Sequence, residues 1–149
     1  MIHRMGRTAL FLQGFSANGH GRPPEVGRVE NPRRIVMAAA CPFPGVQGSQ
    51  VLIQEMITGL AARGHRIDLV TYPFGMDAQW RCPRGCRIHR VNTRLRYPAH
   101  HPGLHPVKPL LDAALARLLE EVVRRRGADL IHAHSVEGLM AALWVRRQT

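Results

Sequence analysis

The sequence has little of several residue types, and each shortage argues against a class of protein. Three cysteines in 149 residues, at positions 41, 82 and 86, are too few and odd in number for the disulfide framework of a small secreted domain. The longest apolar run, residues 35–41, is far shorter than the ~20 residues of a membrane-spanning helix. Apolar residues 9–12 also fall short of the roughly 7–15 residues in the core of a signal peptide. We therefore expect a globular protein of a reducing, cytoplasmic compartment.

Acidic residues are scarce as well. Ten Asp and Glu stand against 21 Lys and Arg, only one of them lysine, and the formal net charge is +11. Such a balance favours an anionic partner, whether nucleic acid, a small anion or a lipid surface, and the absence of any partner is the remaining alternative. The arginines are spread along the chain, and the acid-free stretch 78–111 holds only Trp80 and Tyr97 as aromatic residues, so we do not expect nucleic acid. That stretch is compatible with peripheral contact at the inner face of a membrane.

The chain divides into two parts. Residues 1–32 are rich in glycine and proline without periodicity, which predicts a poorly ordered leader. From residue 33 to 149, apolar runs of strand length alternate with helical periodicity, which predicts one α/β domain with a mainly parallel, Rossmann-like sheet and flanking helices. Strands are expected at 35–40, 65–72, 86–91 and 129–133, and helices from an N-cap at Ser49 to Gly64, at 109–126 and at 136–147.

A turn-rich loop joins the first strand to the first helix. Its sequence is Pro-Gly-Val-Gln-Gly-Ser at residues 44–49. Free N–H groups and the helix dipole at such a place favour a phosphate or another anion. The glycines form neither a dinucleotide-binding fingerprint nor a P-loop, and an ordinary tight turn remains the alternative interpretation.

A second candidate lies on the last expected strand. In Asp-Leu-Ile-His-Ala-His-Ser, residues 129–135, strand alternation sends His132 and His134 to one face and Ile131 and Ala133 to the other. A neutral imidazole at His134 could hydrogen-bond a substrate hydroxyl, while a purely structural role for either histidine stays open.

The sequence offers weaker candidates for a metal site or for a catalytic nucleophile. Cys82, Cys86 and His89 lack the closed pairs of a zinc site, as do His100, His101 and His105. No Gly-x-Ser-x-Gly elbow occurs, and Cys41 is interpreted as a small buried side chain. We expect no metal and no cofactor.

Three segments in order resemble a known family. They are residues 33–50, with the strand and glycine loop, residues 60–71, with Leu-Ala-Ala-Arg-Gly-His and the following strand, and residues 129–134, with Asp-Leu-Ile-His-Ala-His. Together they resemble the N-terminal domain of family 4 (group 1) glycosyltransferases of the two-domain GT-B type. The resemblance implies transfer of a sugar, with retention, from a nucleotide-sugar to a sugar or lipid acceptor.

The resemblance also assigns roles to residues. It implies that His134 is the active-site histidine, that Gly45, Gly48 and Ser49 lie beside the sugar diphosphate and acceptor, and that Ser135 and Glu137 line the same cleft. It implies no metal, and the nucleotide-sugar is a co-substrate rather than a cofactor.

The departure from the family concerns the donor side. Family members hold the nucleotide-sugar mainly through a C-terminal domain with an Arg and Lys pair and a Glu-x7-Glu motif, and no such domain occurs in these 149 residues. We therefore expect a catalytically incomplete, acceptor-side half of a GT-B fold whose partner half is absent or separately encoded. The alternative is a non-catalytic binding module for a partner subunit or an anionic surface.

Overall fold

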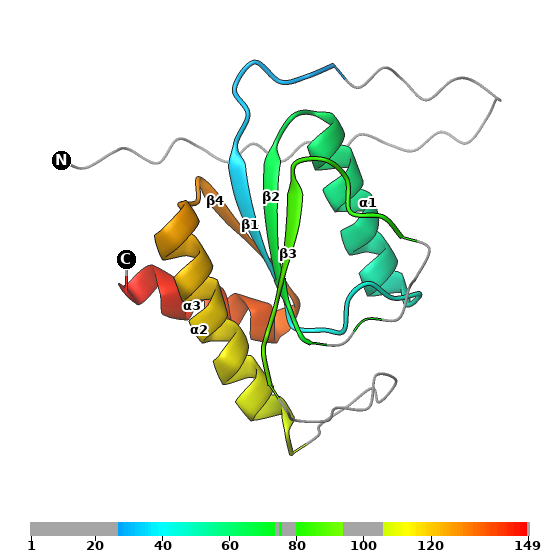
Figure 1. The fold of residues 1–149 in the computed structure, drawn as a ribbon. Helices are drawn as coiled ribbons and strands as arrows, with labels where there is room; N and C mark the ends of the chain where they lie inside the picture. Colours follow the sequence, from blue (N-terminus) through cyan, green and yellow to red (C-terminus); the bar gives the residue numbers. More distant parts are fainter. Residues whose placement is uncertain (1–26, 74, 76–79, 94–105, 149) are drawn as a thin grey trace.

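The computed structural model describes residues 27–73, 75, 80–93 and 106–148. A single sheet lies between helices in this part of the chain (Figure 1). The elements in chain order are β1 (Arg34–Ala39), α1 (Gly48–Ala62), β2 (Arg66–Thr71), β3 (Cys86–Arg90), α2 (Lys108–Arg126), β4 (Leu130–His134) and α3 (Ser135–Gln148).

The four strands are all parallel and lie in the order β3-β2-β1-β4. β1 is central and nearly all of it is buried, as expected for a continuous apolar run in a parallel sheet with both faces covered. In register, Ala39 of β1 lies beside Thr71 of β2 and His134 of β4. The expectation of a Rossmann-like α/β fold is confirmed.

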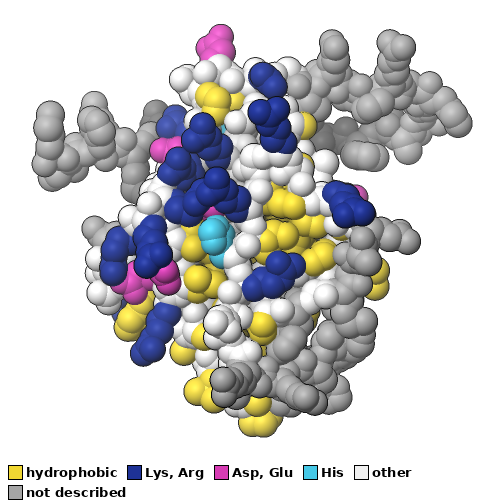
Figure 2. Space-filling model, in the orientation of Figure 1, with side chains coloured by type: hydrophobic (Ala, Val, Ile, Leu, Met, Phe, Trp, Pro, Cys, Tyr) yellow, Lys and Arg dark blue, Asp and Glu magenta, His cyan; other side chains and the backbone are white. Residues whose placement is uncertain are grey.

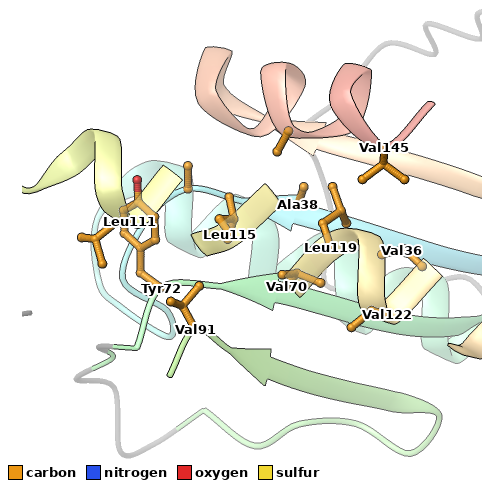
Figure 3. Packing of buried hydrophobic residues seen from close by; sticks show 12 residues of the cluster. Val36, Ala38, Val70, Tyr72, Val91, Leu111, Leu115, Leu119, Val122 and Val145 are labelled. Carbon is orange, nitrogen blue, oxygen red and sulfur yellow. The ribbon is translucent and has the colours of Figure 1, made fainter. Parts of the chain in front are cut away.

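Helices cover both faces of the sheet. On one face, Ile53 and Ile57 of α1 pack with Met37 of β1 and Leu69 of β2. On the other face, α2 and α3 pack on the same strands. Figure 3 shows the leucines of α2 pointing at the sheet. Labelled members of that second cluster are Val36, Ala38, Val70, Tyr72, Val91, Leu111, Leu115, Leu119, Val122 and Val145.

Two details of α1 correct the sequence-based expectation. The helix begins at Gly48, with Gln47 in an extended conformation as its N-cap, so Ser49 lies inside the first turn. The backbone N–H of Gln47 donates to Oε1 of Gln50 (3.2 Å), which is the reciprocal bond of a capping box and gives the N–H of the N-cap a partner within the helix. Leu52 belongs to the apolar 3.6-residue repeat of this helix, which predicts that it is buried, but it is 52% exposed.

A glycine follows the carboxyl end of both α1 and α2. Gly64 follows α1 with a φ of 95°, and Gly127 caps α2 with a φ of 71°, both conformations that favour glycine. Residues 27–32 precede β1 without regular structure, and the N–H of Val29 donates to the carbonyl oxygen of Arg63 (3.1 Å). The rest of the expected leader, and His100, His101 and His105, lie outside the described residues. Within the described ranges no helix has both the length and the apolar character needed to cross a bilayer.

Candidate functional site

The connections that leave β1 and β4 diverge. β1 continues into α1 on one face of the sheet, and β4, its neighbour, continues into α3 on the other. In open α/β sheets a crevice forms at such a topological switch point, outside the carboxyl ends of the strands, and ligands bind there. Of the two segments singled out in the sequence, the glycine loop begins at this end of the sheet and the histidine strand ends there.

The glycine loop is organised around one buried side chain. Gln50 is 5% exposed, and its Nε2 donates to the carbonyl oxygen of Pro42 (2.8 Å). Gly45 lies directly against this amide, because a Cβ at Gly45 would lie 1.9 Å from Oε1 of Gln50. Gln54 secures the same turn by donating to the carbonyl oxygen of Gly45 (3.0 Å). The loop is therefore held by helix side chains, and glycine at position 45 makes room for them.

The first turn of α1 is open to solvent. Gly48 and Ser49 are exposed, and nothing in the described structure lies within 4 Å of a Cβ built on Gly48. The turn carries no acidic residue. The N–H groups of Gly48 and Ser49 and the positive end of the helix dipole can therefore face an anion, whereas the N–H of Gln50 donates to the carbonyl oxygen of Gln47 (2.9 Å).

His132 and His134 lie on one face of β4, as the alternation predicted, with ring centroids 4.5 Å apart. Burial lowers the pKa of both imidazoles, and His132 further lowers the pKa of His134. Both rings are therefore neutral at pH 7. Nε2 of His134 is buried and has no hydrogen-bond partner among the described residues. An unsatisfied buried nitrogen is costly, and a ligand hydroxyl would satisfy it.

The junction between β4 and α3 is tightly built. Ser135 has a φ of 71°, which is strained for a residue other than glycine and is commonest at functional sites. Its Oγ accepts from the N–H of Gly138 (3.4 Å) and so caps the helix. A Cβ on Gly138 would lie 2.7 Å from the carbonyl oxygen of Ala38, so α3 rests almost directly on β1.

Glu137 is held by a residue that sequence reasoning did not select. Its carboxylate pairs with the ammonium of Lys108, at the start of α2, and that contact lowers the pKa of Glu137. Lys108 also lies 3.6 Å from Asp112. Because the carboxyl group stays ionised and paired, it is poorly suited to act as a general acid. The one available signal was that Lys108 is the only lysine in the chain.

The structure thus forms two neighbouring groups. Gly45, Gly48 and Ser49 lie where β1 passes into α1, and His134, Ser135 and Glu137 lie where β4 passes into α3. No hydrogen bond or ion pair joins the two groups within the described ranges.

Other chemistry has less support in the described structure. No three potential ligands among His, Cys, Asp and Glu come together there as a metal site. Cys41 follows β1 near the crevice, and burial raises the pKa of its thiol to about 11. It is protonated at neutral pH and is a poor nucleophile.

The fold defines a class: an α/β domain with a parallel sheet, whose candidate site lies at the carboxyl ends of the strands. The family model of the glycosyl transferase 4-like domain matches residues 47–149. The chain therefore belongs to the glycosyl transferase 4-like family. Gly48, Ser49, His134, Ser135 and Glu137 lie within the matched residues, and Gly45 precedes them. No match was found among curated proteins.

Proposed function

We propose that this domain supplies the acceptor side of a retaining glycosyltransferase that uses a nucleotide-sugar. The observation that carries the proposal is Nε2 of His134, buried without a described partner at the switch point. In the reaction, the bond from the anomeric carbon to the donor diphosphate breaks, and a bond from that carbon to an acceptor oxygen forms. The acceptor proton leaves with the diphosphate or passes to solvent.

The described residues suit distinct parts of this reaction. The neutral imidazole of His134 hydrogen-bonds a hydroxyl of the sugar or the acceptor, and its effect is largest where that bond strengthens in the transition state. The open first turn of α1, with Gly48 and Ser49, faces the negative charge that develops on the leaving diphosphate. Ser135 and Glu137 shape the crevice, with Glu137 fixed by Lys108.

The proposal includes a second half. In it, the nucleotide-sugar is held mainly by a C-terminal half that these 149 residues do not contain, and these residues alone do not turn over a nucleotide-sugar. The location is cytoplasmic, and the acceptor is a sugar or a lipid at the inner face of the membrane, which the acid-free basic stretch 78–111 supports. Flotation with anionic liposomes tests the membrane contact, and a chain that stays with the unbound fraction would refute it.

A transfer screen tests the proposal. Nucleotide-sugars are offered to the 149-residue chain alone and together with a candidate C-terminal half. We expect transfer only from the pair, and His134→Gln should lower kcat by about a hundredfold or more. The matched control is His65→Gln, at the amino end of β2, which should keep the activity. Sugar transfer by the chain alone would show that it is not catalytically incomplete. An unchanged kcat in the His134→Gln variant would overturn the role of His134.

A second candidate function rests on the exposed face of α3. Five apolar side chains of this helix are at least 42% exposed, and a groove of 480 Å³ runs between α2 and α3. Such a surface favours a binding module that docks a partner subunit. The exposed residues are Val136, Leu139, Met140, Leu143 and Trp144. Complex formation without transfer, insensitive to His134→Gln but abolished by Met140→Glu, would favour this function.

A further inference from the structure

The amino ends of the strands carry a cluster of arginines far from the crevice. Two adjoining hollows, of 350 and 580 Å³, open at this end of the sheet, and Arg34, Arg66 and Arg126 line both. Arg87 completes the smaller hollow and Arg33 the larger. We call these five residues the amino-end cluster. Figure 2 shows basic side chains gathered on this part of the molecule, beside a histidine.

The acids in the hollows are already engaged. Asp68 is buried, and its Oδ1 lies 2.8 Å from Nε of Arg126 and 2.8 Å from Nε2 of His89. Asp129 accepts the backbone N–H of Arg34 at Oδ2 (2.8 Å). Asp68 therefore offsets the charge of Arg126, and Asp129, whose bond is to a neutral N–H, can offset at most one more guanidinium group.

Four arginines of the cluster are left over. Among the described residues, Arg126 is the only member of the cluster whose side chain forms an ion pair. The other four are Arg33, Arg34, Arg66 and Arg87. All four line the hollows, and Arg33, Arg66 and Arg87 are exposed. Solvent ions or a ligand must supply the negative charge.

Local dipoles do not remove this excess. α1 and α2 both end at the amino side of the sheet, and each carboxyl end contributes about half a negative charge. Those two ends and the two carboxylates still carry less charge than five guanidinium groups. The hollows are therefore electropositive, and their walls focus the field on an anion.

We propose that the amino-end cluster binds a polyphosphorylated anion, in which at least two linked phosphates occupy the two hollows. Guanidinium groups suit this ligand because their planar pairs of N–H donors match phosphate oxygens. Arg34, Arg66 and Arg126, shared by both hollows, lie where linked phosphates would meet. A free polyphosphate and a phosphorylated lipid headgroup present the same chemistry to the cluster.

This site is separate from the proposed transfer site. Strands of five to six residues place the two ends of the sheet roughly 16–20 Å apart, at about 3.3 Å per residue. A donor diphosphate beside the glycine loop cannot reach the cluster. The proposal therefore does not depend on transferase activity, and binding measurements alone can test it.

The experiment titrates tripolyphosphate into the 149-residue chain by calorimetry in about 150 mM salt. We expect Arg34→Gln combined with Arg66→Gln to weaken binding by about tenfold or more. The matched control, Arg146→Gln combined with Arg147→Gln, removes the same charge from α3, which lines neither hollow, and should bind as the original chain does. Arg87 is exposed on the edge strand β3, so Arg87→Gln provides a single variant with little risk to folding. Circular dichroism confirms that each variant is folded.

The outcomes separate a built site from general basicity. No binding of tripolyphosphate, or equal weakening by the cluster and control variants, would overturn the proposal. A second arm uses phosphatidylcholine vesicles with a few per cent of a phosphoinositide. Flotation that requires Arg34 and Arg66 and is competed by tripolyphosphate supports the headgroup as the source, and tripolyphosphate binding without flotation supports a free polyphosphate. A short RNA that binds in preference to tripolyphosphate and depends on Arg34 and Arg66 would overturn the proposed ligand.

Discussion

At the scale of single residues, Gly45 and Gly48 lie in one loop but meet different surroundings. A Cβ at position 45 would overlap the buried amide of Gln50, whereas one at position 48 meets nothing within 4 Å. Gly45→Ala should therefore displace Gln50 from the carbonyl oxygen of Pro42 and lower the free energy of unfolding by about 1–3 kcal/mol. Urea denaturation at 25 °C measures this.

Gly48→Ala is the matched control. It lies at the first position of α1, where alanine is a better helix former than glycine, so stability should stay unchanged or rise by up to about 1 kcal/mol. Equal losses in the two variants would contradict the role given to Gln50, because they would point to a general intolerance of side chains in the loop.

The histidine pair predicts a pH dependence. Burial lowers the pKa of His132 and His134 below the ordinary value of 6.5, so the unfolded chain takes up these protons first as the pH falls. The stabilising contribution of the neutral rings is complete above about pH 6.5 and is lost as the pH falls toward their folded pKa. The urea concentration at the unfolding midpoint should decrease as the pH is lowered from about 7.5 to about 5.5.

The variant with His132→Gln and His134→Gln separates these rings from His65 and His89. Its urea midpoint should fall less over the same pH range, because the buried pair no longer contributes. An equal fall in both proteins would show that the pair is not a source of acid sensitivity.

Sequence reasoning reached some of this site and missed the rest for a physical reason. Alternation along a strand is local, so the shared face of His132 and His134 followed from the sequence. The contact of Lys108 with Glu137 joins residues 29 apart, and no local period reports it. Serine is a common N-cap, so the sequence predicts a cap at Ser49, but the side chain of Gln50 accepts from the N–H of Gln47 and the N-cap is Gln47.

At the scale of elements, apolar runs and glycines at helix ends predicted every strand and helix that the structure describes. The bounds agree within about two residues, because Gly64 and Gly127 stop their helices by backbone conformation. The polar contacts that join the elements could not be predicted from the sequence in the same way. Asp68, in the middle of an apolar strand, joins β3 to the end of α2 through His89 and Arg126.

This link makes Asp68 the polar residue on which the edge strand β3 depends. Its side chain is 4% exposed, so Asp68→Asn leaves Arg126 partly buried without a charge partner and should cost about 2–4 kcal/mol of unfolding free energy. Glu121→Gln is the control, because Glu121 and Arg125 form an ion pair on the surface of α2 at 50% and 75% side-chain exposure. That change should stay within about 0.5 kcal/mol. A loss below about 1 kcal/mol for Asp68→Asn would show that the buried network is dispensable.

At the scale of the whole molecule, the net charge of +11 sets a long-range repulsion against the compact state. The ion pairs of the described residues oppose it, and salt weakens both effects. Two of those pairs, Arg124 with Glu120 and Arg125 with Glu121, keep their arginines at least 70% exposed, so each contributes well under about 1 kcal/mol. The excess of cations is the larger effect.

Salt should therefore stabilise this protein. Raising sodium chloride from about 0.01 to 0.1 M shortens the screening length from about 30 to 10 Å, which removes repulsion between distant arginines more than attraction within contact pairs. The free energy of unfolding by urea should rise, by about 1 kcal/mol. The rise should be smaller in the variant with Arg146→Gln and Arg147→Gln, because two charges fewer repel one another in the folded state. A decrease in the free energy of unfolding over this range of salt concentration would show that the ion pairs of the described residues outweigh the net charge of +11.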